Sequence, residues 1–96
     1  MYQIAWTKLA KETHQQIFDF VLENWSIDVV IRFDEEVQGL LQNLKQHKHL
    51  CPPLKGRIII RKCVISPHVS LLYRVNEQNQ VIELLTFFDN RANHPY

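Results

Sequence analysis

The spacing of the apolar residues changes its period along this 96-residue chain, and that change limits the folds open to it. Between Lys8 and Leu44, apolar side chains recur at steps of three and four residues, as on helices that pack against a core. Pro52-Pro53 cannot continue a helix, and after Gly56 the apolar residues form short runs rich in β-branched and aromatic types. The chain therefore predicts helices followed by a sheet, an α+β arrangement.

The first half of the sequence contains signals for one strand and two helices. Alternation over Tyr2–Trp6 predicts a short strand. Thr7 is placed to cap a helix over residues 8–24, and Ser26 to cap a second helix with Asp28 favourably set in its first turn. The short break between them predicts an antiparallel helical hairpin. Their apolar stripes are Ala10, Ile17, Phe20 and Val21 in the first helix, and Val30, Phe33, Val37, Leu40 and Leu44, reinforced by Leu41, in the second.

The second half predicts a three-stranded antiparallel meander, which a polar linker from Gln46 to Pro53 precedes. The expected strands are Arg57–Ile65, Val69–Val75 and Gln80–Phe88, with turns at Ser66-Pro67-His68 and Asn76-Glu77-Gln78-Asn79. The whole order is β-α-α-β-β-β in a single domain of residues 1–96, with the helices on one face of the sheet.

Composition favours a soluble globular protein of the cytoplasm. Apolar residues make up 46% of the chain and charged residues 22%, which argues against disorder. The longest apolar stretches are interrupted by Asp28, Arg32 or Arg61-Lys62, so we expect no membrane span, and the N-terminus lacks the pattern of a secretory signal. Two cysteines, Cys51 and Cys63, are too few for the framework of a small secreted domain, and a reducing compartment is expected.

The net charge of +1 hides an asymmetry between the two halves of the chain. Residues 1–50 carry five Lys/Arg and seven Asp/Glu, a balance of −2, whereas residues 51–96 carry six and three, a balance of +3. The basic half is the half that forms the sheet, which gives a mild electrostatic footprint for an acidic partner.

The end of the chain combines a buried type of strand with polar chemistry. The apolar run Val81–Phe88 leads directly into Asp89–Tyr96, which contains Arg91, Asn93 and His94. A rigid sheet would hold these groups at its rim, where binding and catalytic side chains are commonly displayed.

Four features of the sequence resemble the RelE/ParE superfamily of bacterial type II toxin–antitoxin toxins. They are the opening strand and helical hairpin with Trp6 at its first turn, the basic strand Arg57-Ile58-Ile59-Ile60-Arg61-Lys62, the strand Leu71-Leu72-Tyr73-Arg74-Val75, and the ending Phe87-Phe88-Asp89-Asn90-Arg91-Ala92-Asn93-His94-Pro95. The ending is similar to the D-N-R-x-N-P ending of many ParE-like members, with His94 inserted before the proline. The resemblance spans essentially the whole chain and implies the RelE/ParE fold.

The resemblance also implies a partner and two alternative activities. Toxins of this superfamily are neutralised by a cognate antitoxin whose C-terminal segment wraps the hairpin and sheet, so a toxin–antitoxin hetero-oligomer is expected. RelE-like members cleave mRNA on the ribosome, whereas ParE-like members poison DNA gyrase without known nuclease chemistry. A degenerate member that only binds an antitoxin is a third alternative. None of these implies a cofactor.

RNA cleavage by attack of the 2′-hydroxyl requires cations on the phosphate and groups that transfer protons. The candidate catalytic residues are Arg61 and Arg91 for the phosphate, with His94 or Tyr96 for the protons. This chain would be an enzyme only on that RelE-like reading.

Two positions depart from the RelE-like pattern, because Cys63 and Ser70 stand where that branch tends to carry Lys and Arg. The resemblance therefore favours the ParE-like side, with a target bound by the basic strand and the tail. The candidate target-binding residues are Arg57, Arg61, Lys62, Arg91 and Asn93. The alternative for the three basic residues on the strand is that they are solvated strand positions.

Several apolar residues of the helices lie off the main stripes and offer a surface for an amphipathic partner helix. These candidate antitoxin-binding residues are Leu9, Phe18, Leu22, Ile27, Ile31 and Leu41.

Three further expectations concern structural roles. Arg74 is expected to pair with Glu83 across the meander. His47-x-His49-x-Cys51 matches no established zinc spacing, so we expect no metal. Cys63 is expected to be a small buried or half-buried strand residue.

Overall fold

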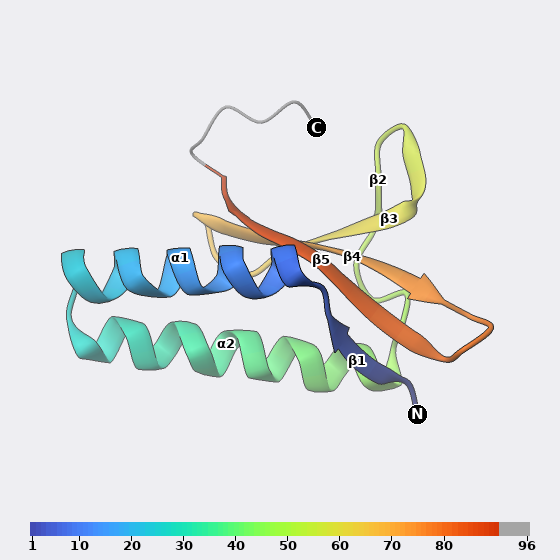
Figure 1. Cartoon of the computed structure of the whole chain (residues 1–96), viewed down its shortest axis with the longest axis horizontal. Helices are drawn as coiled ribbons and strands as arrows, with labels where there is room; N and C mark the ends of the chain where they lie inside the picture. Colours follow the sequence, from blue (N-terminus) through green and yellow to red (C-terminus); the bar gives the residue numbers. More distant parts are fainter. Residues whose placement is uncertain (91–96) are drawn as a thin grey trace.

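A computed structural model describes residues 1–90, and of residues 57 and 58 only the backbone. Its elements in chain order are β1 (Gln3–Trp6), α1 (Lys8–Asn24), α2 (Ile27–Gln46), β2 (Pro53–Leu54), β3 (Arg57–Val64), β4 (Val69–Asn76) and β5 (Val81–Asp89) (Figure 1). The predicted α+β order is confirmed, and the predicted bounds of the first helix are those observed. The short strand β2 within the predicted linker is an addition.

The two helices begin where the sequence predicts, but only one cap is made by a side chain. Thr7 Oγ1 accepts a hydrogen bond of 3.1 Å from the backbone N–H of Ala10, and its hydroxyl donates to the carbonyl of Leu84 at 2.7 Å. Ser26 is the N-cap residue of α2 but makes no side-chain capping bond. Thr7 therefore both starts α1 and fastens it to β5.

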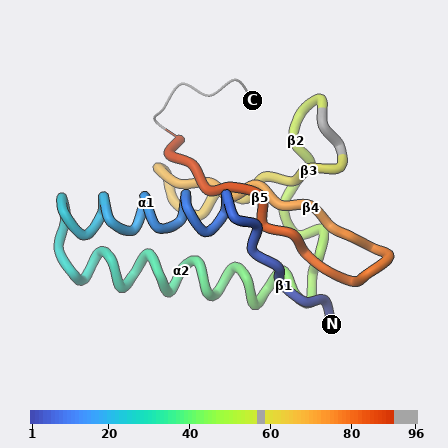
Figure 2. The backbone as a smooth tube through the Cα atoms, viewed as in Figure 1, coloured from blue at the N-terminus to red at the C-terminus, as the bar shows by residue number. Residues whose placement is uncertain are grey.

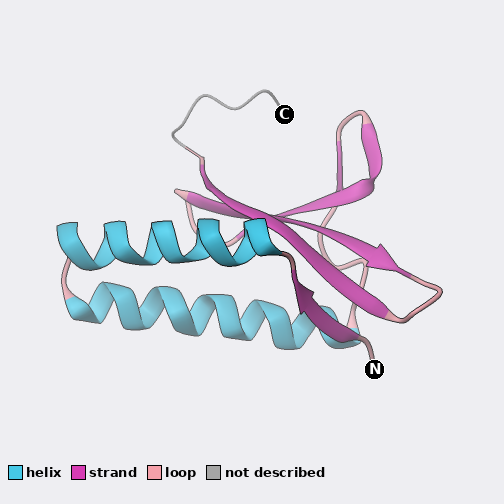
Figure 3. Cartoon of the chain, viewed as in Figure 1, coloured by secondary structure: helices cyan, strands magenta, loops and turns pink. Residues whose placement is uncertain are grey.

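The sheet has the strand order β1-β5-β4-β3-β2. Its strands are drawn in magenta in Figure 3. The meander β3-β4-β5 is antiparallel as predicted, whereas β1 pairs with β5 in parallel, from Gln3 opposite Val81 to Trp6 opposite Leu84. The connection between these two parallel strands runs through the helical hairpin and then through β2, β3 and β4. Segments from the two ends of the sequence thus lie side by side (Figure 2).

The last residue of the predicted polar linker, Gln46 to Pro53, belongs to a strand that the sequence did not predict. Pro53 and Leu54 pair with β3 at the edge of the sheet, opposite Arg61 and Arg57. The strand is short because proline lacks the N–H needed to extend a ladder. Gly56 turns the chain into β3 with a φ of +81°, a backbone conformation that other residues rarely adopt.

Both helices pack on one face of the sheet, and the core lies between these layers (Figure 1). Its largest fully buried side chains are Tyr73, Phe87, Leu44, Leu71, Ile82, Leu84 and Val37. In the first helix the predicted stripe is only partly buried: Ala10 is fully enclosed, while Phe20 is 48% exposed. Phe20 belongs to the C-terminal part of α1, and the tip of the hairpin extends past the sheet (Figure 1).

A disulfide joins Cys51 of the linker to Cys63 of β3. The expected burial of Cys63 is confirmed, since only 2% of this residue is exposed. The bridge itself was not predicted, because two cysteines twelve positions apart give no pairing signal until the linker is known to fold back on β3.

Candidate functional site

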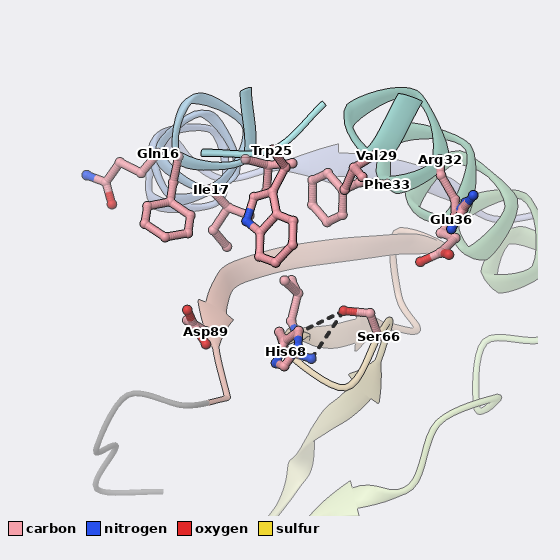
Figure 4. Close-up of a pocket in the computed structure, with 13 residues that line it drawn as sticks. Gln16, Ile17, Trp25, Val29, Arg32, Phe33, Glu36, Ser66, His68 and Asp89 are labelled. Atoms are coloured by element: carbon pink, nitrogen blue, oxygen red, sulfur yellow. Dashed lines mark hydrogen bonds between the residues drawn. The ribbon is translucent and has the colours of Figure 1, made fainter. Parts of the chain in front are cut away.

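The tip of the helical hairpin and the β3–β4 turn enclose an apolar pocket of about 480 Å³, here called the hairpin groove. Its lining residues are Gln16, Ile17, Phe20 and Val21 of α1, Trp25 of the inter-helix turn, Val29, Arg32, Phe33 and Glu36 of α2, Ser66 and His68 of the β3–β4 turn, Val69 of β4 and Asp89 of β5. Figure 4 shows side chains of both helices directed toward the β3–β4 turn.

Exposed aromatic groups give the hairpin groove its character. Phe20 and Trp25 are 48% and 56% exposed although both are large apolar side chains. Trp25 ends α1, where its backbone N–H donates to the carbonyl of Val21 at 2.8 Å, and this position fixes the indole at the mouth of the groove. Exposed aromatic surface of this kind is typical of a binding site for an apolar segment of a partner.

Charged groups of both signs stand on the rim of the hairpin groove. Arg32 and Glu36 come from α2 and Asp89 from the end of β5. Such an arrangement suits a partner that carries polar side chains on either side of an apolar anchor.

The β3–β4 turn is held by its own serine. Ser66 Oγ accepts hydrogen bonds from the backbone N–H groups of His68 and Val69, both at 3.2 Å (Figure 4). Asn90 fastens the end of β5 to the same turn, because its N–H donates to the carbonyl of His68 at 2.6 Å and its Oδ1 accepts from the buried Ser70 hydroxyl at 2.7 Å. The residue before Arg91 therefore has a fixed position beside the groove.

His14 lies between α1, α2 and the sheet in a cluster of aromatic rings. Its ring centroid is 5.2 Å from that of Trp6, 5.3 Å from that of Phe87 and 6.0 Å from that of Phe33. Its Nε2 is buried and has no hydrogen-bond partner among the described residues. Burial lowers the pKa of His14, and the carboxylate of Asp34 offsets part of that effect.

The basic residues of β3 are directed to different surroundings. The guanidinium of Arg61 donates from Nη1 to the carbonyl of Cys51 at 2.7 Å, so it faces the linker. Lys62, the next residue, places its ammonium 5.6 Å from the centre of the Phe88 ring. Successive residues of a strand point to opposite faces, so Arg61 and Lys62 cannot converge on one phosphate from this strand.

Tyr73 completes the contacts of the linker. Its hydroxyl donates to the carbonyl of Lys48 at 2.9 Å and accepts from the N–H of Cys51 at 3.3 Å. The residue is fully buried, and burial raises the pKa of its phenol. The linker is thus attached to the sheet through polar contacts that surround the disulfide.

A second polar cluster joins three segments at the opposite end of the sheet from the hairpin tip. Lys48 donates to Glu77 at 2.6 Å and to the Tyr2 hydroxyl at 2.9 Å, while Tyr2 donates to Glu77 at 2.8 Å and His49 lies 3.5 Å from the same carboxylate. The hydrogen bond between Lys48 and Glu77 raises the pKa of the Lys48 ammonium and lowers the pKa of the Glu77 carboxyl group.

The predicted pair Arg74–Glu83 is confirmed. Nε of Arg74 lies 3.0 Å from Oε1 of Glu83, and the two residues are directly opposite each other on β4 and β5. Arg74 therefore supports the meander.

The candidate antitoxin-binding residues lie outside the lining of the hairpin groove. Leu9, Leu22, Ile27 and Ile31 are between 48% and 58% exposed, but none of them lines the hairpin groove. Phe18 is half-buried. Leu41 is a correction, because it is 6% exposed and belongs to the core: its side chain faces the sheet together with that of Leu44.

Several residues predicted for catalysis or target binding fall outside the described part of the chain. These are Arg91, Asn93, His94 and Tyr96, together with the side chain of Arg57. The residues of the hairpin groove, in contrast, were missed by sequence reasoning. The available signal was Trp25 at a helix break, where a large apolar residue is neither on a stripe nor in a strand.

The run His47-x-His49-x-Cys51 lacks its third ligand, because the Cys51 sulfur is bonded to Cys63. Within residues 1–90, no group of three or more His, Cys, Asp or Glu side chains is placed to hold a metal ion. The same part of the chain contains no helix of the length and hydropathy needed to span a bilayer.

Solved structures with a similar fold include bacterial toxins and toxin–antitoxin systems. The chromosomal ParDE system of P. aeruginosa matches with a TM-score of 0.74 at 15% identity, covering 93% of this chain and 96% of that chain. A copper-bound mutant toxin from Helicobacter pylori matches with a TM-score of 0.69 at 22% identity, covering 94% and 96%. The RelBE2 toxin–antitoxin complex of Mycobacterium tuberculosis matches with a TM-score of 0.58 at 16% identity, covering 93% and 98%. The TM-scores show that the chain shares the RelE/ParE toxin fold.

The sequence itself matches a family model. The model is described as "ParE toxin of type II toxin-antitoxin system, parDE", and the match extends over residues 4–93. The chain therefore belongs to the ParE toxin family. Among curated proteins, none matches the sequence at a significant level.

Proposed function

We propose that this chain is a growth-inhibiting toxin that acts in the ParE manner, by docking onto DNA gyrase, and that a cognate antitoxin neutralises it. The observation that carries the proposal concerns the two positions where RelE-like nucleases tend to carry cations. Here Cys63 is buried in a disulfide, and Ser70 is fully buried with its hydroxyl donated to Asn90. Both positions serve the fold, which supports an interaction poison over an endoribonuclease.

Membership of the ParE family is the second support for this proposal. The third support is that the side chains of Arg61 and Lys62 have different neighbours: Arg61 contacts the linker and Lys62 contacts the Phe88 ring. A nuclease needs its cations around one phosphate. Under the proposal, the target is contacted by the strand residues Arg57, Arg61 and Lys62 and by the tail residues Arg91 and Asn93.

Induced expression in a bacterium tests the target. We expect arrested growth, gyrase-linked DNA breaks and intact transcripts, with the effect weakened by Arg91→Ala. Arg74→Ala is the matched control, because Arg74 is an arginine of the sheet that is paired with Glu83, and it should leave toxicity in place. Cleaved transcripts that become intact on Arg91→Ala would show a ribosome-dependent mRNA endoribonuclease instead. Normal growth would show a degenerate member that only binds an antitoxin.

The hairpin groove is the proposed contact for the antitoxin. It presents exposed aromatic groups between two helices, and an amphipathic segment would bury them while its polar residues meet Arg32, Glu36 and Asp89. The solved relatives include toxin–antitoxin complexes, which is consistent with a protein partner of this kind.

Substitution in the hairpin groove tests this contact. Phe20→Glu places a charge in the apolar lining, so we expect binding of the antitoxin from the neighbouring reading frame to weaken at least about tenfold in titration calorimetry. Ile59→Glu is the control, because Ile59 is 66% exposed on β3 and does not line the groove. Equal binding by the Phe20 variant and the wild type would contradict the assignment, and loss on Leu9→Glu alone would place the contact on the outer face of α1.

A further inference from the structure

The Cys51–Cys63 disulfide lies at the centre of the contacts that hold the linker after α2 against the sheet. Among residues 47–53, Cys51 is the only buried residue, at 9% exposed, while its neighbour Leu50 is 48% exposed. The side chain of Cys51 is therefore the one anchor that this stretch places in the core.

Arg61 depends on the same stretch for its position. Its Nη1 donates to the carbonyl of Cys51, and Arg61 is two residues from Cys63 on β3. The ladder with β4 holds the strand that carries the guanidinium, and the disulfide ties to this strand the residue whose carbonyl accepts from it.

The other contacts of the linker are non-covalent. Around Cys51 they are the hydrogen bonds of Cys51 with Tyr73 and Arg61, that of the Tyr73 hydroxyl with Lys48, and the N–H of Lys62 donating to the carbonyl of Pro52 at 3.0 Å. On either side of this stretch, Lys48 and His49 contact Glu77, and Pro53 and Leu54 pair with β3. Hydrogen bonds of this type are individually worth no more than the entropy of ordering a residue or two of backbone. Once the covalent link is opened, the short stretch around Cys51 keeps only hydrogen bonds of this type, so the contribution that outweighs its ordering entropy is lost.

We propose that Cys51 and Cys63 form a redox-controlled latch that holds the Arg61 guanidinium against the linker when oxidised and releases it to solvent when reduced. Intracellular disulfides are typically reversible and redox-sensing. Arg61 is also a residue that the sequence assigns to target binding. A connection between redox state and toxicity rests on the proposed function, but the latch itself does not.

The chemistry of opening is thiol–disulfide exchange with a small thiol such as glutathione. Its thiolate attacks Sγ of Cys51, the more exposed of the two cysteines, and the bond to Cys63 breaks, so that Cys63 leaves as a thiolate and takes a proton. A second thiol then displaces Cys51 from the mixed disulfide. Two protein thiols and one disulfide of the reductant result, and two electrons have passed to the protein. Closure is the reverse reaction with glutathione disulfide as oxidant.

The accessibility of Arg61 tests the latch without reference to any target. Oxidised wild-type protein and the double variant Cys51→Ser/Cys63→Ser are treated with phenylglyoxal, and arginine modification is followed by peptide mass spectrometry. Neither protein has free thiols, so the reagent reports on arginines alone. We expect Arg61 to react at least fivefold faster in the double variant, while Arg74, paired with Glu83 in both proteins, changes less than twofold. Equal rates at Arg61 would overturn the proposal.

Hydrogen exchange on the wild-type chain provides a second readout that needs no substitution. Within the first minute of labelling, the amides of Leu50, Cys51 and Lys62 should exchange in protein treated with dithiothreitol and stay protected in oxidised protein. The amides of β4 should stay protected in both. Identical early labelling of the linker in the two forms would overturn the proposal, because the disulfide would then have no effect on the order of the linker. Early labelling of β4 in the reduced form would also overturn it, because reduction would then unfold the sheet and not only the linker.

Discussion

His14 illustrates how a single side chain can make stability depend on pH. It is surrounded by aromatic rings, its Nε2 is buried, and burial lowers its pKa below the ordinary value of about 6.5. The folded protein therefore binds a proton at this position more weakly than the unfolded chain does. The stability that this neutral ring provides is complete above about pH 6.5 and is lost as the pH falls toward its lower folded pKa.

We expect His14→Phe to reduce the loss of unfolding free energy between pH 7.5 and pH 5.0. The phenyl ring keeps an aromatic group in the cluster and cannot be protonated. Urea denaturation of both proteins at the two pH values measures the effect, and a wild type and variant with equal losses would contradict it. Glu77, whose pKa is lowered by Lys48, affects stability only in a more acidic range, below about 4.5, so the two contributions are separable.

Individual contacts were predictable where both partners were marked by the sequence. The ion pair between Arg74 and Glu83 was predicted from their opposite charges on either side of a turn, and this pairing is confirmed. Trp25 could not be placed in the same way, because its exposure depends on how far the hairpin extends past the sheet, and that is a property of the folded whole. The aromatic neighbours of His14 come from distant segments and were invisible for the same reason.

The two helix caps offer a direct comparison between elements that look alike in sequence. Thr7 and Ser26 both precede a helix, but only the side chain of Thr7 makes a capping hydrogen bond. The Thr7 hydroxyl accepts from the N–H of Ala10 and donates to the carbonyl of Leu84, which links α1 to β5. Thr7→Ala should therefore lower the unfolding free energy by about 1–2 kcal/mol. Ser26→Ala should lower it by less than about 0.5 kcal/mol, since Ser26 is exposed and makes no side-chain cap bond. Chemical denaturation of the two variants checks this, and equal losses would contradict it.

Elements were predictable where the period of the pattern was unambiguous. The first helix has the predicted bounds, and the three long strands of the meander deviate by one residue at most ends. The strand β2 was missed because Pro53 argues against a strand on intrinsic grounds, and its pairing comes from the return of the linker to β3. Local preference was overridden by tertiary contact.

For the molecule as a whole, the disulfide contributes stability that a reductant should remove. Closing a loop between cysteines twelve positions apart is expected to stabilise the folded state by about 3 kcal/mol through the entropy of the unfolded chain. Urea denaturation with and without dithiothreitol measures this difference. The variant Cys51→Ser/Cys63→Ser is the control, because its stability should not respond to the reductant. A wild type that is equally stable in both conditions would contradict the expectation.

The position of β5 in the sheet has a consequence for synthesis on the ribosome. This strand is the last of the described elements to be made, yet it lies between β1 and β4 and supplies Ile82, Leu84 and Phe87 to the core. The first strand, β1, can pair only after β5 has been made, since Gln3–Trp6 pairs with no other strand of the described sheet. Folding of this chain is therefore completed only after translation has passed residue 89, and a product terminated before β5 lacks the core side chains of that strand and its pairing with β1 and β4, on which toxicity would depend.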